Sequence, residues 1–249
     1  MAADRVPFSM KYLPIFIVPV LALGSCMLFT DYVEGNGDVV VRHYAVDDFN
    51  EIEQAGIGRV VVTQGTAGPY PVTAVGESNI LERITVGVSG DTLVMEQENG
   101  VSLHPTQEPL FLVTLPVCER LVLSGAGDIE TDGTIIGGTV RIVLQGSGNI
   151  EADVEADSVI CVLAGAGDID LEGNTVAADL SITGAGDIDA DDLSTDACDA
   201  VITGAGDIFV RVKNTLYAAI YGSGDIVYRA DGDLVVYPTV TGAGSVRSR

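Results

Sequence analysis

The sequence predicts an all-β protein, a parallel β-solenoid with about 20 residues per coil that follows an irregular β cap at its N-terminal end. Three observations predict it: a regular repeat, a strict alternation of apolar and polar residues, and a glycine content too high for a helical protein, with 30 glycines in 249 residues. Seven copies of a Gly-small-Gly motif, usually followed by Asp-Ile, are spaced 18 to 21 residues apart. They begin at Gly125, Gly146, Gly165, Gly184, Gly204, Gly222 and Gly242.

Alternation within each repeat indicates a strand with one face buried. In the segment Leu180–Ala190 every second residue is apolar or glycine, and the residues between them are polar or small. This period of two is typical of a half-buried strand. The motif glycines share the parity of the aliphatic residues, which predicts a tight bend or a wall so close that no Cβ fits. A single repeat cannot bury its apolar row alone, so the repeats are expected to stack.

Residues 1–25 are expected to be a signal peptide. Arg5 and Lys11 precede a stretch without charge from Tyr12 to Thr30, which is typical of a leader or a short membrane anchor. The residues Leu23-Gly-Ser-Cys26 resemble a bacterial lipobox, so Cys26 is the predicted lipidation site and residues 26–46 a linker to the anchor. Met27 after this cysteine resembles the pattern of lipoproteins sent to the outer membrane. An uncleaved anchor, and a secreted protein in which Cys26 has no role, are the alternatives.

Residues 47–118 are predicted to form the N-terminal β cap, and residues 119–249 the solenoid repeats. Ile52 to Val62 follow the repeat parity and are expected to open the solenoid. Strands are then predicted at 72–75, 84–88 and 93–96, with a hairpin turn at 88–93 and a buried strand between Pro109 and Pro116. Cys118, Cys161 and Cys198 fall in coils that are not consecutive, so we expect free, buried thiols.

The net charge of −24, from 36 acidic and 12 basic residues, argues against a nucleic-acid partner, because phosphate contacts require clustered Lys and Arg. No nucleophile elbow, phosphate loop or metal-ligand spacing of His and Cys occurs. The oligomeric state is not predicted.

The repeats resemble the head GIN domain family of putative auto-transporter adhesins. The resemblance rests on Gly146-Ser-Gly-Asn-Ile150 and its Gly-Ala-Gly-Asp-Ile siblings, on Phe49-Asn-Glu-Ile52 with Gly58–Gly65, and on Gly90-Asp-Thr-Leu93, and it extends from Val39 to Val246. It implies a β-helix-like solenoid, often on a lipoprotein, and supplies no catalytic residues.

Stacked coils place equivalent residues in columns about 4.8 Å apart. One column follows the second glycine: Asp128, Asn149, Asp168, Asp187, Asp207, Asp225 and Ser245. Another lies two residues further on and is acidic at Glu130, Glu151, Asp170 and Asp189. Two interpretations are open. Each Asp accepts hydrogen bonds from N–H groups of its own glycine-rich turn, or Ca²⁺ bridges the carboxylates. The candidate calcium ligands are Asp128, Glu130, Asp168, Asp170, Asp187, Asp189, Asp207 and Asp225.

The residue between the two glycines is always small, either because bulk would clash with the next coil or because it forms a flat docking stripe. Thr183, Ala185, Thr203, Ala205 and Tyr221 are the candidate stripe residues. The predicted function is a non-enzymatic lipid-anchored protein of the cell envelope, in the outer membrane, whose acidic solenoid surface serves adhesion or scaffolding. Its candidate partners are the membrane through the lipid anchor, a glycan and an envelope protein. The alternative is a glycosidase or lyase built on a β-helix, which an open groove beside a carboxylate pair would favour. Clustered exposed aromatic side chains would favour sugar binding.

Overall fold

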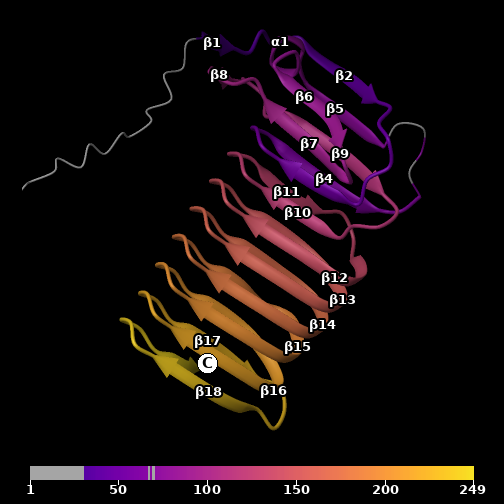
Figure 1. Cartoon of the computed structure of the whole chain (residues 1–249). Helices are drawn as coiled ribbons and strands as arrows, with labels where there is room; N and C mark the ends of the chain where they lie inside the picture. The colour runs from indigo at the N-terminus through magenta and orange to yellow at the C-terminus, as the bar shows by residue number, and fades with distance from the viewer. Residues whose placement is uncertain (1–30, 67, 69–70) are drawn as a thin grey trace, which may run out of the picture.

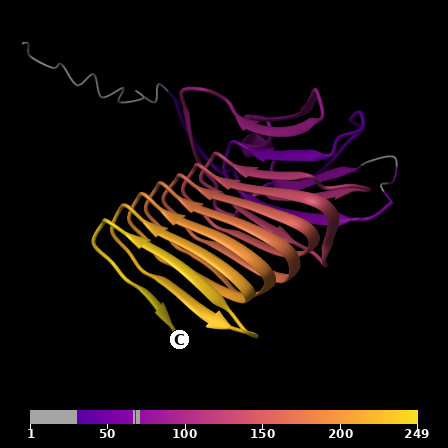
Figure 2. The same ribbon diagram turned by 60° about the horizontal axis from the view of Figure 1, so that its bottom comes forward.

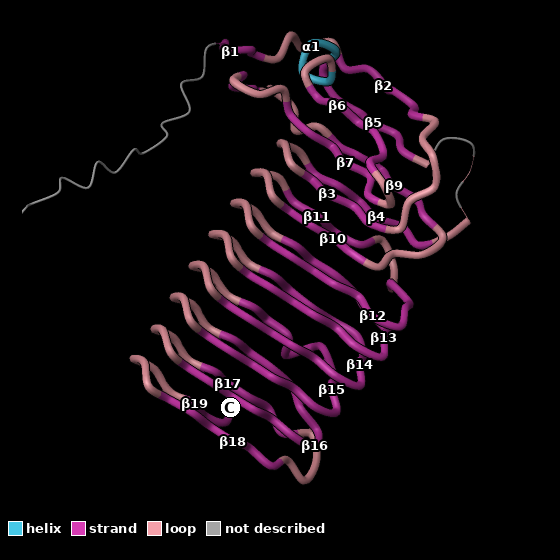
Figure 3. The backbone as a smooth tube through the Cα atoms, in the orientation of Figure 1, coloured by secondary structure: helices cyan, strands magenta, loops and turns pink. Residues whose placement is uncertain are grey.

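The computed structural model describes residues 31–66, 68 and 71–249, and within them it is almost entirely β-structure (Figure 1). The predicted signal peptide and Cys26 lie outside the described residues. No helix in the described ranges is long and apolar enough to cross a membrane. The strands of the N-terminal region are β1 Asp31–Glu34, β2 Val39–Tyr44, β3 Glu51–Gln54, β4 Arg59–Gln64, β5 Val72–Glu77, β6 Ile84–Ser89, β7 Thr92–Gln97, β8 Val101–His104 and β9 Leu110–Leu115. One short helix, α1 Ser78–Leu81, follows β5 (Figure 3).

The solenoid consists of parallel strands stacked in chain order. They are β10 Arg120–Leu123, β11 Asp128–Thr131, β12 Ile135–Leu144, β13 Ile150–Leu163, β14 Ile169–Ile182, β15 Ile188–Ile202, β16 Ile208–Ile220, β17 Ile226–Ala230, β18 Val235–Val240 and β19 Val246–Ser248. Each coil runs out along one wall, bends, and returns along the other wall (Figure 2). The first wall is the half of each coil that follows a Gly-small-Gly turn, such as residues 169–175 of β14, and the second wall is the half that precedes the next turn, such as residues 177–182. The Gly-small-Gly turn then leads into the next coil.

The coils stand directly on one another, as the repeat predicts. Ile150, Ile169, Ile188 and Ile208 pair in register through four successive coils. The register shifts in the middle of β15, where residues 191–193 have no partners in β16. This bulge bends the wall locally without interrupting the pairing of the second wall.

A single apolar core fills the space between the walls. In β14, for example, Leu171, Leu180 and Ile182 are fully buried, and the same inward row repeats in β13, β15 and β16. Burial of one such side chain stabilises the fold by about 1.5–3 kcal/mol. The alternation in the sequence therefore corresponds to the core side and the solvent side of each wall.

The motif glycines are required by the close approach of successive coils. A Cβ at Gly184 would lie 2.1 Å from the carbonyl oxygen of Gly165, and one at Gly186 would lie 2.0 Å from that of Gly167. The same contact recurs at every Gly-small-Gly turn of the described chain. The missing Cβ atoms thus face the neighbouring coil along the solenoid axis.

Cap and solenoid are joined by strands that stack out of chain order. β3 and β4 form the first coil, since β3 pairs with β10 and β4 with β11, all in parallel. On their other side lie β7 and β9, also parallel. The predicted hairpin is present as the antiparallel pair β6–β7, while β5 and β2 continue the other wall in antiparallel pairing. Ile80, Leu81 and Phe111 are fully buried here, so the cap closes the N-terminal end of the core.

A buried carboxylate ties the cap loops together. Glu77 of β5 is fully buried and accepts hydrogen bonds from the Gly37 N–H at 2.6 Å, the Thr106 N–H at 2.7 Å and the Thr106 hydroxyl at 2.8 Å. Burial disfavours its charge, but these hydrogen bonds outweigh it, and the pKa of Glu77 is lowered. No repeat or motif in the sequence marks this residue.

Candidate functional site

The column that follows the motif glycines forms a ladder of hydrogen bonds between coils. The backbone N–H of Asp187 donates to Oδ1 of Asp168 at 2.9 Å, and that of Asp207 donates to Oδ1 of Asp187 at 2.7 Å. The same bond joins every successive pair from Asp128 to Ser245. We call these seven residues the aspartate ladder.

This arrangement corrects the prediction that each Asp accepts bonds from its own turn. The donor belongs to the equivalent residue of the following coil, 18 to 21 residues later in the chain. A hydrogen bond to a charged group contributes about 1.5–3 kcal/mol, which offsets repulsion between carboxylates of adjacent coils. At the last bond, the Ser245 N–H and hydroxyl and then Arg247 lower the pKa of Asp225. The ladder therefore has a structural role between coils.

A second set of carboxylates lies on the solvent side of the first wall. Glu130, Glu151, Asp170 and Asp189 pair in register as one acidic column. Beside it, two or three residues further along each coil, Asp153, Glu172 and Asp192 form another acidic column, which was not among the predicted site residues. Residues of both columns line a cavity of about 270 Å³.

The electrostatics of this face are those of crowded like charges. The pKa of Asp170 is raised by partial burial and then by the neighbouring carboxylates of Asp189 and Glu151. At the cap end, Arg59 lies 3.4 Å from Glu130 and 4.0 Å from Glu108. In the part of the chain that the structure describes, Glu151 and Asp170 in the middle of the column form no ion pair with a basic side chain, so this part presents net negative charge.

The calcium prediction stays a prediction. Within residues 31–66, 68 and 71–249, no group of three or more His, Cys, Asp or Glu side chains is placed to hold a metal ion. Of its eight candidate ligands, the five ladder members Asp128, Asp168, Asp187, Asp207 and Asp225 each use Oδ1 to accept a backbone hydrogen bond. The remaining three, Glu130, Asp170 and Asp189, belong to the acidic column. Melting of the chain with and without chelator tests the prediction, and the absence of any shift would remove it.

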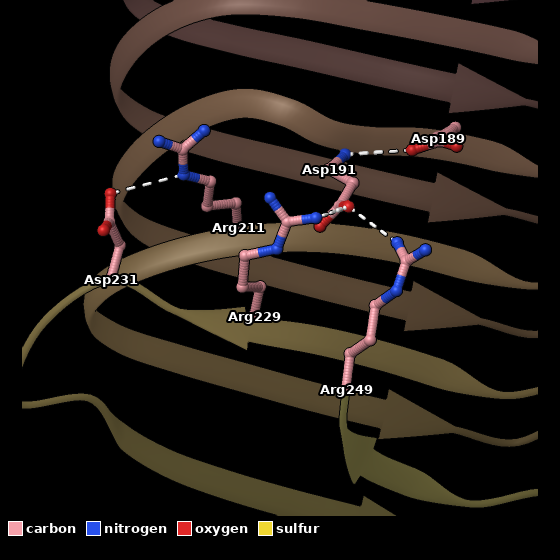
Figure 4. A network of polar contacts seen from close by, with 6 residues as sticks. All are labelled: Asp189, Asp191, Arg211, Arg229, Asp231 and Arg249. Atoms are coloured by element: carbon pink, nitrogen blue, oxygen red, sulfur yellow. Dashed lines mark hydrogen bonds and ion pairs between the residues drawn. The ribbon is translucent and has the colours of Figure 1, made fainter.

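A carboxylate–arginine cluster fastens the last coils at the bulge of β15 (Figure 4). Asp191, which is nearly buried, accepts hydrogen bonds from Arg229 and, at 2.7 Å, from Arg249. Its own N–H donates to Oδ1 of Asp189 at 3.0 Å. The bulge thus places the Asp191 carboxylate within hydrogen-bonding distance of two arginines that lie 38 and 58 residues later in the chain.

The predicted small-residue stripe lies on the surface. Thr183, Ala185, Thr203, Ala205 and Tyr221 are all exposed, and Ala185 and Ala205 pair across adjacent coils. The tight contacts that the structure shows between coils are made by the flanking glycines, so the steric explanation for the small middle residue stays a prediction. The prediction of a docking stripe is not tested by this observation.

Exposed aromatic rings lie on the second wall of the last coils. Tyr217 and Tyr237 pair in register and stack with ring centroids 4.8 Å apart, and both are about half exposed, as is Tyr221. Stacked exposed tyrosines present apolar ring faces together with hydroxyl groups.

The other candidate residues have structural surroundings. Cys118, Cys161 and Cys198 are free and buried, as predicted, and burial raises the pKa of Cys118 to about 12. His43 shares a hydrogen bond with Thr73, and His104 stacks on Tyr32.

Comparison with known proteins shows which family has this fold of stacked, in-register coils. Residues 48–232 match the family model "Putative auto-transporter adhesin, head GIN domain". The chain belongs to this family. No curated protein matches it. A crystal structure of a putative adhesin from Bacteroides fragilis is similar, with a TM-score of 0.82 and 25% identity over 87% of this chain and 100% of that one.

Two further solved structures share the head GIN fold. A putative lipid binding protein from Parabacteroides distasonis has a TM-score of 0.71 and 24% identity over 88% of this chain and 100% of its own. A putative adhesin from Parabacteroides merdae has a TM-score of 0.67 and 23% identity over 88% of this chain and 99% of its own. At these identities the likeness shows the fold alone.

Proposed function

We propose that this head GIN domain protein is a non-enzymatic, lipid-anchored envelope protein whose first wall adheres to, or scaffolds, a cationic partner surface. The observation that carries the proposal is the acidic column, in which carboxylates from four successive coils stand in register on the solvent side. A rigid row of equal charges can make many weak contacts at once, and avidity then exceeds the affinity of any one contact. The family's description as adhesins supports this function and an envelope location.

Adhesion is tested by fixing envelope fragments to a surface, adding beads that carry the full chain, and counting the beads that the surface retains after washing. We expect retention to fall as salt rises, because surface charges are screened. Beads that carry the variant Glu151→Gln/Asp170→Asn should be retained in smaller number than beads that carry the wild type. The matched control is Asp179→Asn/Asp199→Asn, which removes the same charge from a column of the second wall and should behave as the wild type. Equal retention by both variants would contradict the proposal.

The lipid anchor is a separate part of the proposal and rests on the lipobox-like residues before Cys26. Mass spectrometry of the N-terminal peptide from membrane-extracted protein should find acylated Cys26, and Cys26→Ala should release the protein from the membrane fraction. An intact N-terminus beginning at Met1 would contradict cleavage at this cysteine.

The stacked tyrosines support a glycan as one partner, since sugar rings pack on exposed aromatic faces. Tyr217→Ala/Tyr237→Ala should then lower retention on glycan-coated beads while leaving retention on cationic beads unchanged. Release of sugar products from the same glycans would instead support the glycosidase or lyase alternative.

A further inference from the structure

Arg141 stands apart from the other cations of this acidic chain. The described residues contain ten Lys and Arg side chains, and nine of them lie within 4.0 Å of a carboxylate. Arg141 is the exception among them. With 36 acidic residues in the sequence, a cation left without an acidic partner is contrary to the rest of the surface.

The neighbours of Arg141 in the sheet give no structural reason for an arginine at this position. In the second wall it pairs in register with Arg120 on one side and with Ile160 on the other. Arg120 is neutralised by Glu51 at 3.0 Å. Like charges opposite each other on adjacent strands are destabilising, so the fold gains nothing from a second arginine here.

Both arginines line a cavity of about 430 Å³ between the cap and the solenoid. That volume is within the range of small-molecule sites. Thr139, Glu51 and Glu119 contribute further polar groups to its lining. It lies against the second wall, away from the acidic column.

The backbone beside the cavity is open as well. β10 pairs with β12 only from Arg141 to Leu144, so the preceding residues of β12 have no strand partner on that side within the described chain. Gly137 and Gly138 lie in this stretch and line the cavity, and a Cβ built on Gly138 would meet nothing within 4 Å. A wall without side chains lets a ligand approach the backbone closely.

We propose that this cavity binds a small acidic sugar, that is, a hydroxylated ligand with one oxyanion group, either a uronate carboxylate or a sugar phosphate. Arg141 supplies the unused guanidinium fork that suits both oxyanions. Arg120 lies next to it as a second donor, and Glu51 and Glu119 accept hydrogen bonds from sugar hydroxyls. The proposal does not depend on adhesion by the first wall and goes beyond it.

Calorimetric titration of the full chain tests the proposal with four probes: glucuronate, glucose 6-phosphate, inorganic phosphate and neutral glucose. We expect one or both acidic sugars to bind and glucose not to bind. Glucuronate alone would identify a carboxylate ligand, and glucose 6-phosphate alone a phosphate ligand. Arg141→Gln should weaken binding at least about tenfold, because it removes a charge-assisted bidentate contact.

Gly138→Leu provides an independent variant, because it adds bulk at a residue of the cavity lining where a Cβ meets nothing within 4 Å. It should also weaken binding at least about tenfold with an unchanged melting temperature. Arg247→Gln removes a paired arginine elsewhere and is the control. The proposal is overturned if no acidic sugar binds, if glucose binds equally well, if inorganic phosphate alone binds, or if either cavity variant binds as the wild type does.

Discussion

Replacement of one motif glycine by alanine should destabilise the solenoid strongly. In Gly184→Ala the new Cβ would stand 2.1 Å from the Gly165 oxygen and 2.6 Å from the Ala164 carbonyl carbon, whereas real Cβ contacts under 3.0 Å essentially do not occur. The two coils must therefore separate by roughly 1 Å at this corner. Two backbone hydrogen bonds cross the same gap, from the Ala185 N–H to the Gly165 oxygen at 2.9 Å and from the Gly184 N–H to the Leu163 oxygen at 3.2 Å.

The expected loss follows from these terms. Overpacking costs about 1–3 kcal/mol, and each weakened backbone bond costs about 0.5–1.5 kcal/mol. We therefore expect the free energy of unfolding to fall by about 2–6 kcal/mol, measured by urea denaturation with circular dichroism. The matched control is Gly87→Ala in strand β6, where a new Cβ would meet nothing within 4 Å. A loss below about 0.5 kcal/mol for Gly184→Ala, the range of ordinary surface substitutions, would refute the steric reasoning.

Three further predictions concern ionisable groups. The pKa of Glu77 is lowered in the folded protein, so its contribution to stability is present above the ordinary value of 4.5 and is lost as the pH falls through the lower, folded-state value. The melting temperature should therefore drop in acid less steeply for Glu77→Gln than for the wild type. The raised pKa of Asp170 means that its charge destabilises the fold, so Asp170→Asn should raise the melting temperature at pH 7 and lose that advantage below the ordinary pKa of 3.8. A higher melting temperature that persists in acid would contradict the electrostatic cause. Asp191→Ala leaves two arginines unpaired and should speed amide hydrogen exchange in residues 226–249 while coils before β13 keep their protection; uniform loss of protection would contradict a local fastening role.

The repeat fold was open to prediction from sequence because its determinants are local and periodic. The alternation around Leu180 and Ile182 predicted the strand faces, and the spacing of Gly165 and Gly184 predicted that the coils stack in register. The cap was only partly predictable. Its strands and hairpin were anticipated, but the return of the chain past β3 and β4 depends on pairings between distant segments.

The candidate site was likewise predictable in part from the sequence. The sequence alone established the acidic column, since stacking converts residues at equal offsets into neighbours. It could not assign the partner of each ladder carboxylate, because a turn's own N–H and that of the next coil are equally plausible donors until the coil spacing is known. It also gave no sign that Arg141 would form no ion pair, since Arg120, Ile160 and the cap loop meet around it only in the folded chain. Contacts that repeat from coil to coil can be predicted from the period of the sequence. Contacts at a bulge, at an end of the solenoid or between cap and coil depend on distances that only the tertiary structure sets.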